Sequence, residues 1–315
     1  MVCDPRTGFA RRARRFALFT ALLFLVSGLG AQAQTQTNQA EQLVKLNVIV
    51  IDRGQSVEGV RKEDLRLTED GVPQTVSYFA KDERPITFGL VIDASGSVRL
   101  ILMSLIEAAK TAVSGLHPGD EAFVARFVGR GNFQIKQEIT SDREAIEDAL
   151  NGIYVEGGQT ALLDAVDNTL KYLDANRPSD VNSRRRVLIL VTDGEDRASK
   201  PDDAKAMLAR LRQSDVQVFV IGLTKFSALQ SSASKATNLL NEMAGQTGGR
   251  ALFPDSPSDL PDVATKIARD LHTQYVISYS PTNRTAGAES KVQVGWIGAE
   301  QGKRKVIVRP TVWNK

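Results

Sequence analysis

The sequence predicts an α/β fold: a doubly wound, Rossmann-like, mainly parallel six-stranded sheet, inserted in a small β-sandwich-like module made from both chain ends. Two observations predict it. Between residues 86 and 271, short apolar runs alternate with segments of helical periodicity, which favours a parallel sheet with helices on both faces. The segments before and after this region contain strand patterns without helices between them. Because those strands need another sheet to bury their apolar side, we expect the two ends to combine.

The N-terminal strands begin in residues 43–52, where apolar and polar side chains alternate, as in a strand with one buried face. Residues 65–68 and 75–79 predict a hairpin, because Asp70 and Gly71 between them are typical of a tight turn. These strands assign residues 34–84 to the first half of the β module.

Six strands and six helices are expected in residues 85–273. The strands are predicted at residues 86–92, 121–128, 133–140, 187–191, 216–222 and 249–253, and the helices near residues 98–115, 142–152, 160–175, 202–212, 232–246 and 258–272. Only residues 129–132 separate the second strand from the third. This is too short for a parallel crossover, so the third strand should be an antiparallel edge strand. Strands at residues 274–279, 291–295 and 304–312 then complete the β module, which assigns residues 274–315 to it.

A secretory signal peptide is predicted in residues 1–33. An apolar run over residues 16–29 follows Arg11, Arg12, Arg14 and Arg15, and Ala31 and Ala33 come after it at a suitable cleavage site. The run has 14 residues, fewer than the ~20 that span a bilayer. We therefore expect an exported protein, in the periplasm, the cell envelope or outside the cell, without a transmembrane anchor after cleavage.

Charge and cysteine content narrow the class of partner. The formal net charge is +3, but residues 1–33 contain five arginines and one aspartate, so the remaining chain carries about −1. This balance does not suggest nucleic acid, and Arg184, Arg185 and Arg186 are expected to be a solvated lead-in to the next strand. The one cysteine, Cys3, lies in the leader, so the exported protein is expected to have no disulfides.

Oxygen-bearing side chains follow two of the expected parallel strands. Asp93, Ser95 and Ser97 come directly after residues 86–92, and Asp193 follows residues 187–191. In a sheet of order 3-2-1-4-5-6 these strands are neighbours at the switch point, where a crevice forms. Thr160 opens a predicted helix that could face the same crevice. Carboxylates and hydroxyls are ligands for a hard divalent cation, so the pattern predicts a metal site.

The motifs Asp-x-Ser-x-Ser at residues 93–97, Gly-Gly-x-Thr-x-Leu at 157–162 and Thr-Asp-Gly at 192–194 closely resemble those of the von Willebrand factor type A domain. The resemblance covers about residues 85–275. That family carries a metal-ion-dependent adhesion site, called MIDAS. The resemblance implies that Ser95, Ser97 and Thr160 contact the ion, while Asp93 and Asp193 bind it directly or through water.

The flanking segments carry a second resemblance. Val-x-Val-x-Asp at residues 48–52, Glu-Asp-Gly at 69–71 and Tyr-x-x-x-Tyr-x-Pro at 275–281 look like motifs of exported bacterial proteins related to von Willebrand factor A, of the type common in acidobacteria.

The expected function is metal-dependent protein binding or adhesion, without enzymatic activity. An ion with few carboxylates bound directly to it stays electrophilic and keeps an open position, which an Asp or Glu side chain of a protein partner can fill. Mg²⁺ suits six oxygens and retained waters, and Mn²⁺ or Ca²⁺ are the alternatives. A different hypothesis is a structural scaffold subunit of a cell-envelope complex, with a vestigial or merely stabilising metal site.

A metal-dependent phosphohydrolase is the remote alternative, because Asp93 could in principle accept a phosphoryl group. A dehalogenase-like site needs an acid two positions later, where Ser95 stands, and Ser95 is not in a Gly-x-Ser-x-Gly elbow. The two histidines, His117 and His272, are expected to be structural or at the surface, which argues against a zinc site or a hydrolytic triad.

The local alternatives concern single residues. Ser95, Ser97 or Thr160 alone would most often cap a helix. Glu195 and Asp196 are expected to be solvated loop acids, and Asp164 is expected to complement a helix dipole.

Overall fold

The structure is a computed structural model that describes residues 43–178, 180, 183–198, 201–226, 230–282, 290–299 and 303–310. These residues belong to one compact unit. The predicted signal peptide, residues 1–33, and the end of the predicted last strand, residues 311–312, lie outside the described residues.

A six-stranded sheet runs through the middle of the chain, in the order β11-β10-β9-β6-β7-β8. Its strands are β6 (Ile86–Asp93), β7 (Glu121–Phe127), β8 (Phe133–Thr140), β9 (Arg185–Thr192), β10 (Gln217–Gly222) and β11 (Ala251–Leu252). Neighbouring strands are parallel except β8, which pairs antiparallel with β7 at the edge. The predicted fold class, the antiparallel edge strand and the strand order are confirmed.

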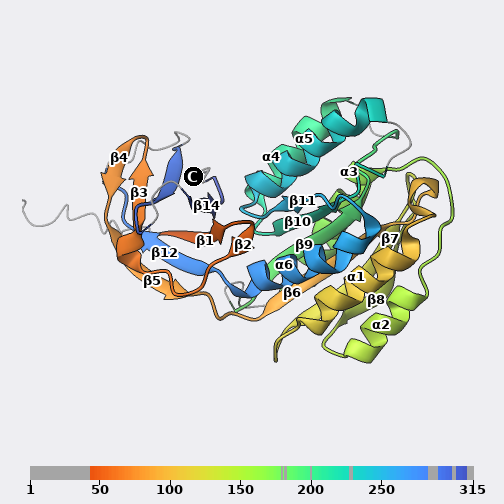
Figure 1. Ribbon diagram of the computed structural model, residues 1–315, viewed down its shortest axis with the longest axis horizontal. Coiled ribbons are helices and arrows are strands. Elements are labelled where there is room, and N and C mark those ends of the chain that lie inside the picture. Colours follow the sequence, from red (N-terminus) through yellow and green to blue (C-terminus); the bar gives the residue numbers. More distant parts are fainter. Residues whose placement is uncertain are drawn as a thin grey trace, which may run out of the picture. The chain divides into compact units, whose positions relative to one another are not determined.

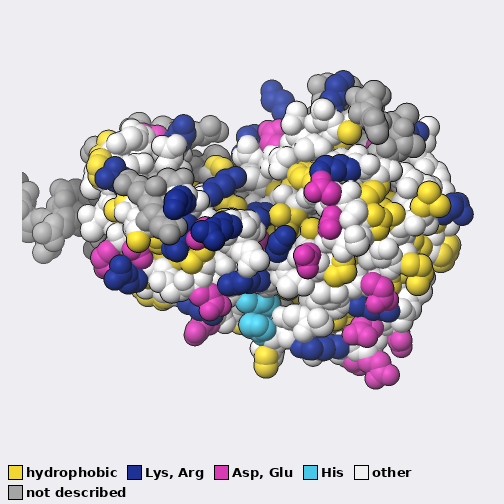
Figure 2. Space-filling view, viewed as in Figure 1, with side chains coloured by type: hydrophobic (Ala, Val, Ile, Leu, Met, Phe, Trp, Pro, Cys, Tyr) yellow, Lys and Arg dark blue, Asp and Glu magenta, His cyan; other side chains and the backbone are white. Residues whose placement is uncertain are grey.

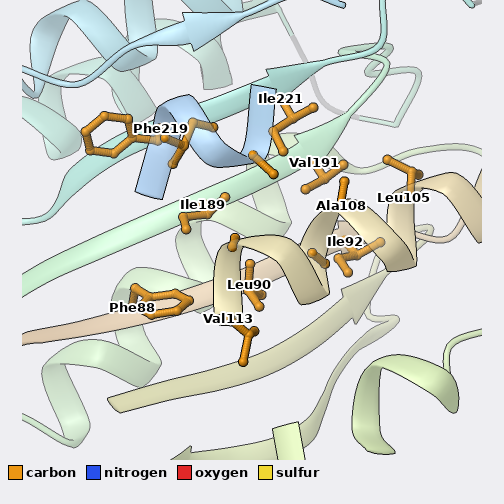
Figure 3. Packing of buried hydrophobic residues seen from close by; sticks show 14 of the residues in the cluster. Phe88, Leu90, Ile92, Leu105, Ala108, Val113, Ile189, Val191, Phe219 and Ile221 are labelled. Atoms are coloured by element: carbon orange, nitrogen blue, oxygen red, sulfur yellow. The ribbon is translucent and has the colours of Figure 1, made fainter. Parts of the chain in front are cut away.

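Helices cover both faces of this sheet (Figure 1). The helices are α1 (Leu102–Ser114), α2 (Arg143–Asn151) and α6 (Leu260–His272) on one face, and α3 (Leu162–Ala175), α4 (Pro201–Gln213) and α5 (Gln230–Gln246) on the other. Because side chains alternate along a strand, Leu90 and Ile92 of β6 join the first apolar cluster, and Val91 joins the second. Figure 3 shows Leu105 and Ala108 of α1 facing the strands of the first cluster.

Two of the predicted helices begin later than expected. A short 3-10 turn, Gly96–Val98, occupies the start of the segment predicted as helix 98–115, and α1 begins only at Leu102. Likewise α3 begins at Leu162, so Thr160 lies in the loop before the helix rather than in its first turn. Ser95 and Ser97 therefore lie at the 3-10 turn before α1, and Thr160 lies in the loop before α3.

The strands from the two chain ends form two further sheets. The first has the order β14-β1-β12-β5, with β2 paired to β1, and the second has the order β13-β3-β4. Their bounds are β1 (Val44–Asp52), β2 (Gln55–Ser56), β3 (Leu65–Glu69), β4 (Val72–Gln74), β5 (Val76–Lys81), β12 (Tyr275–Tyr279), β13 (Val292–Trp296) and β14 (Lys305–Val308). A third apolar cluster contains side chains from both sheets, including Val48, Leu67, Ile277 and Trp296. N-terminal and C-terminal strands therefore pair with each other in each sheet.

The predicted hairpin is correct at its turn and wrong in its second strand. Asp70 and Gly71 both have positive φ angles, which a two-residue hairpin turn requires, and Glu69 pairs with Val72 across it. The second strand, however, is β4, which ends at Gln74, while β5 leaves to pair with β12. Phe79 of β5 stacks on Tyr275 of β12 with ring centroids 5.2 Å apart, a contact between residues too distant in sequence for a local pattern to reveal.

The expectation that residues 184–186 form a solvated lead-in is also wrong. Arg185 and Arg186 are the first two residues of β9 and are only 7% and 5% exposed. Arg186 forms ion pairs with Asp174 and Asp215, and Arg185 lies 3.4 Å from Asp82. Carboxylates from other segments of the chain compensate the charge of these arginines and so permit their burial.

Over the described residues, none of the helices has both the length and the apolar composition that crossing a bilayer requires. On the face shown in Figure 2, acidic and basic side chains are interspersed over much of the surface.

We expect the free energy of unfolding to depend strongly on the packing of β6. Replacing the fully buried Leu90 by Ala should lower it by about 2–5 kcal/mol, because the substitution leaves a cavity between β6 and α1. The matched control is Leu100→Ala, whose side chain is 95% exposed and should change stability by about 0.5 kcal/mol or less. Urea unfolding measures both, and equal effects would contradict the observed packing.

Candidate functional site

Asp93 is the last residue of β6, and its side chain is completely buried. Its Oδ1 accepts a hydrogen bond from the Ser95 backbone N–H at 2.9 Å, and its Oδ2 accepts one from the Thr192 hydroxyl at 2.8 Å. Thr192 in turn accepts a hydrogen bond from Gly194 N–H at 3.0 Å. The carboxylate is thus fixed in position by donors from two neighbouring strand ends.

The three candidate hydroxyls differ in exposure. The Oγ atoms of Ser95 and Ser97 are 2.9 Å apart, and Ser95 and Thr160 are buried, whereas Ser97 is exposed. Ser97 is therefore the hydroxyl through which solvent, or a binding partner, has the most direct access to this edge of the sheet.

Asp193 directly follows β9 and is 2% exposed. Its Oδ1 accepts a hydrogen bond from Glu195 N–H at 3.0 Å. Its Oδ2 is buried and receives no hydrogen bond of normal geometry from the described residues. Burial raises the pKa of this carboxyl, and the nearby Ser97 hydroxyl partly opposes the rise. Buried carboxylate oxygens normally have a partner, so a bound cation would satisfy an oxygen to which the described residues give no hydrogen bond of normal geometry.

Backbone hydrogen bonds connect the three loops that carry these residues. The first loop follows Asp93, the second contains Thr160 and the third contains Asp193. Glu156 N–H donates to Ala94 O at 3.1 Å, which joins the second loop to the first. Arg197 N–H donates to Thr160 O at 3.1 Å, which joins the third loop to the second. The structure therefore brings the loops of all five predicted residues together.

Gly194 is required where the third loop turns. Its φ angle is +75°, and a Cβ atom there would lie 2.8 Å from Leu240 Cδ1 and 2.9 Å from Ala236 Cβ. An L-residue would be strained by the backbone conformation and would also clash with α5. The turn that follows Asp193 is thus compatible with glycine alone.

Burial disfavours the charged forms of both aspartates, and the charge of Asp193 further disfavours that of Asp93. Burial raises the pKa of Asp93 to about 7, the charge of Asp193 adds to this effect, and the hydrogen bonds from Ser95 and Thr192 oppose it. Burial also raises the pKa of Asp193. A cation between two buried carboxylates would reverse this penalty, because it stabilises their charged forms.

The donor set consists of two carboxylates and three hydroxyls. The described residues contain no group of three or more His, Cys, Asp or Glu side chains suited to a metal ion, so a metal at this site would depend on the hydroxyls. An all-oxygen set suits Mg²⁺, Mn²⁺ or Ca²⁺ better than a metal that prefers sulfur or nitrogen. The residues present therefore fit a hard divalent cation.

The structure adds three residues to those selected from the sequence. Thr192 orients Asp93, and its sequence signal was its place directly before Asp193 at the strand end. The expectation of solvated acids at Glu195 and Asp196 is wrong for Glu195, which is buried and pairs with Arg197 at 2.7 Å. Asp196 accepts a hydrogen bond from Leu163 N–H at 3.0 Å and so caps the start of α3.

The two histidines lie outside this site. The rings of His117 and His272, both visible in Figure 2, stack with centroids 3.6 Å apart. His272 Nε2 lies 2.8 Å from Asp120 Oδ2, and Asp120 also accepts a hydrogen bond from Ile86 N–H at 2.7 Å. This arrangement fixes the start of β6 and agrees with the structural role expected for both residues.

Comparison with known families gives one match. The model of the von Willebrand factor type A domain matches residues 88–266, more than half of the chain. This region contains the six-stranded sheet from β6 onward and the three loops described above. No curated protein matches the chain.

Several solved structures are similar to the chain. The von Willebrand factor type A protein from Catenulispora acidiphila is 17% identical, with a TM-score of 0.49, over 80% of this chain and 74% of that one. Proximal thread matrix protein 1 from the mussel byssus, in a structure with a zinc-occupied MIDAS motif, is 18% identical with a TM-score of 0.47, over 62% of this chain and 50% of that one. An aerotolerance-related membrane protein from Bacteroides fragilis is 19% identical with a TM-score of 0.43, over 58% and 98%.

The raised pKa of Asp93 predicts that the metal-free protein loses stability as pH rises. In the unfolded chain this carboxyl has a pKa of about 3.9, while in the folded protein it is about 7. Between these values the folded state holds a proton that the unfolded state has lost, so the free energy of unfolding falls with increasing pH. In EDTA, we expect the stability of the wild type relative to Asp93→Asn to decrease by a few kcal/mol from about pH 4 to pH 7. A difference that stays constant over this range in urea unfolding would contradict the shift.

Proposed function

Because the chain belongs to the von Willebrand factor type A family, we propose that it is an exported module that binds a protein partner through a divalent cation. Domains of this family generally mediate protein–protein interactions and are typically not enzymes. The observation that carries the proposal is the buried Asp193 Oδ2, which receives no hydrogen bond of normal geometry from the described residues and lies at the same sheet edge as Asp93.

In the proposed metal centre, Asp93, Ser95, Ser97, Thr160 and Asp193 hold Mg²⁺, with Mn²⁺ or Ca²⁺ as alternatives. The ion, when bound, supplies a positive charge with an exchangeable coordination position. The two buried carboxylates give the charge that a divalent ion needs, and the hydroxyls add ligands without neutralising it further. Thr192 is a positioning residue, because its hydroxyl holds Asp93 Oδ2. An Asp or Glu carboxylate of the partner would complete the oxygen ligands of the ion, and Ser97 is the exposed residue among those that would hold it.

The surface around this edge supports a protein partner rather than a free carboxylic acid. Leu100 is 95% exposed and Met103 is 70% exposed, and both follow Ser97 closely in the chain. Tyr154, 53% exposed, lies in the segment that hydrogen-bonds to Ala94 through Glu156. Large apolar side chains at such exposure favour interaction surfaces. The proposed partner therefore presents an acidic side chain flanked by apolar ones.

The proposal extends to the organisation of the chain. We infer a cleaved signal peptide in residues 1–33, one β module from residues 34–84 and 274–315, and the metal-binding domain in residues 85–273. The pairing of β1 with both β12 and β14 supports the joint module. Export of the chain depends on the leader and is checked by sequencing the N-terminus of the mature protein.

Metal binding is tested by isothermal titration with Mg²⁺ and Mn²⁺ at about pH 8, where Asp93 is ionised. Wild type should bind one ion, and Asp93→Ala should show no measurable binding, because it loses a charged ligand. Thr192→Val should weaken binding roughly 10-fold or more, since residues that orient metal ligands usually contribute that much. Ser97→Ala removes one of the proposed hydroxyl ligands. Its matched control is Ser114→Ala, which removes an exposed hydroxyl at the end of α1 and should have no effect on metal binding. Equal binding by wild type and Asp93→Ala would refute the metal centre.

Partner binding is tested by affinity capture from a native envelope fraction, in Mg²⁺ and in EDTA. Capture should be lost in EDTA and in Ser97→Ala, and retained in Ser114→Ala. Leu100→Asp separates the two parts of the proposal: it should bind Mg²⁺ normally but lose the partner, because it places a negative charge where we expect apolar contact. If Mg²⁺ raises the melting temperature while capture is indifferent to EDTA and to Ser97→Ala, the scaffold alternative is favoured instead.

A further inference from the structure

A cavity lies at the edge of the six-stranded sheet opposite to the proposed metal centre. Asp93 and Thr192 are at the carboxyl ends of β6 and β9, whereas this cavity is lined by residues at the amino ends of β9 and β10, such as Arg185 and Gln217. Its volume is about 400 Å³, within the range of sites for small molecules. Six arginines and Lys45 line it, the arginines being Arg84, Arg184, Arg185, Arg186, Arg212 and Arg309.

The carboxylates around these side chains are too few to neutralise them. Asp215 is the one acidic residue among the described lining residues, and it is already shared by Arg177 and Arg186. Within the described parts of the chain, the remaining carboxylate partners of the lining arginines are Asp82, Glu121 and Asp174. Lys45 and Arg212 form no ion pair with any described residue. The cavity therefore has an excess of positive charge.

Among the described residues, Arg309 is the clearest case of a cation without a carboxylate in an ion pair with it. Its guanidinium donates to the backbone carbonyls of Ser214 at 2.6 Å, Val216 at 2.5 Å and Thr247 at 3.3 Å. Burial lowers its pKa to about 10, and the charge of Asp215 only partly opposes this. Carbonyl dipoles satisfy the N–H groups but leave the net charge in place, so an anion nearby would be stabilising.

The charge of Arg185, which lines the same cavity, is also incompletely compensated. Its Nη2 donates to Leu271 O, while its Nε and Nη1 are buried without hydrogen bonds of normal geometry to the described residues. Burial lowers its pKa to about 10 despite the neighbouring Asp82, which is itself shared with Arg84 at 2.7 Å. The buried Arg185 and the half-buried Arg309 thus both have incomplete charge compensation in one cavity.

We propose that this cavity binds a small multivalent oxyanion, a phosphate compound or a polycarboxylate. Arginine guanidinium groups match the geometry of such oxygens and form two parallel hydrogen bonds to them. The half-buried Arg212, on α4, and the exposed Lys45, on β1, are available to contact the ligand directly. Because Lys45 belongs to a terminal sheet and Arg212 to the six-stranded domain, the anion would connect the two. This site is separate from the proposed metal centre.

The test is isothermal titration of the full chain with inorganic pyrophosphate, in EDTA and at constant ionic strength. We expect one binding site in wild type and an affinity about tenfold lower in Arg212→Gln and in Lys45→Gln, each of which removes one charged contact. Neither side chain has an ion pair with a described residue to lose, so both variants should fold. The matched control is Lys171→Gln on α3, an exposed lysine paired with Asp167, which should bind as wild type does.

A parallel titration with citrate distinguishes the two sources of oxyanion: tighter binding of pyrophosphate indicates a phosphate ligand, and tighter binding of citrate indicates a polycarboxylate. The proposal is overturned if wild type binds neither anion at millimolar concentration. It is also overturned if Lys171→Gln weakens binding as much as Arg212→Gln, because the effect would then reflect overall charge.

Discussion

The pairing of β6 with β9 is the constraint on which the candidate metal site depends. The two strands run parallel in a register that places Ile92 beside Val191, so Asp93 and Thr192 come next to each other where the strands end. Every residue of both strands is buried, and a shift of this register by one residue would turn their apolar side chains to the wrong faces. Hydrophobic packing on both faces thus fixes the position of a polar contact, the hydrogen bond from the Thr192 hydroxyl to Asp93.

The same burial that fixes the carboxylates makes their charge unfavourable. Asp93 and Asp193 lie in a poorly solvated region and repel each other, which explains why burial and charge together raise the pKa of Asp93. The two buried charges lower the stability of the metal-free protein, and a bound cation would relieve this penalty. Arginines at the other end of the strands show the same effect with the opposite sign, since burial lowers the pKa values of Arg185, at the amino end of β9, and of the half-buried Arg309, which follows β14. The sheet therefore carries excess negative charge at one edge and excess positive charge at the other.

Much of the fold and the candidate site could be predicted from the sequence because the relevant signals are local. Fully apolar runs such as residues 86–92 indicate a strand buried on both faces, and the short link at residues 129–132 indicates an antiparallel neighbour. The five proposed metal ligands stand at the ends of such segments, where strand order brings them together.

The features that sequence did not reveal depend on partners far away in the chain. The burial of Arg185 and Arg186 requires Asp82, Asp174 and Asp215, and no local pattern distinguishes such arginines from solvated ones. The departure of β5 from the hairpin requires β12, nearly two hundred residues later. Thr192 and Glu195 were part of segments already noticed, but their roles follow from side-chain directions that spacing alone does not give.

The adjacency of β5 and β12 has a mechanical consequence. Lys81 is the register partner of Tyr275, and Asp82 N–H donates to Gln274 O at 2.8 Å, so the chain enters and leaves the six-stranded domain at neighbouring positions of one ladder. Tension applied to a partner held at the far edge of that domain would reach the terminal sheets through two parallel links rather than one. Each link would carry part of the load, and the ladder between β5 and β12 would be pulled at one end by both of its strands together.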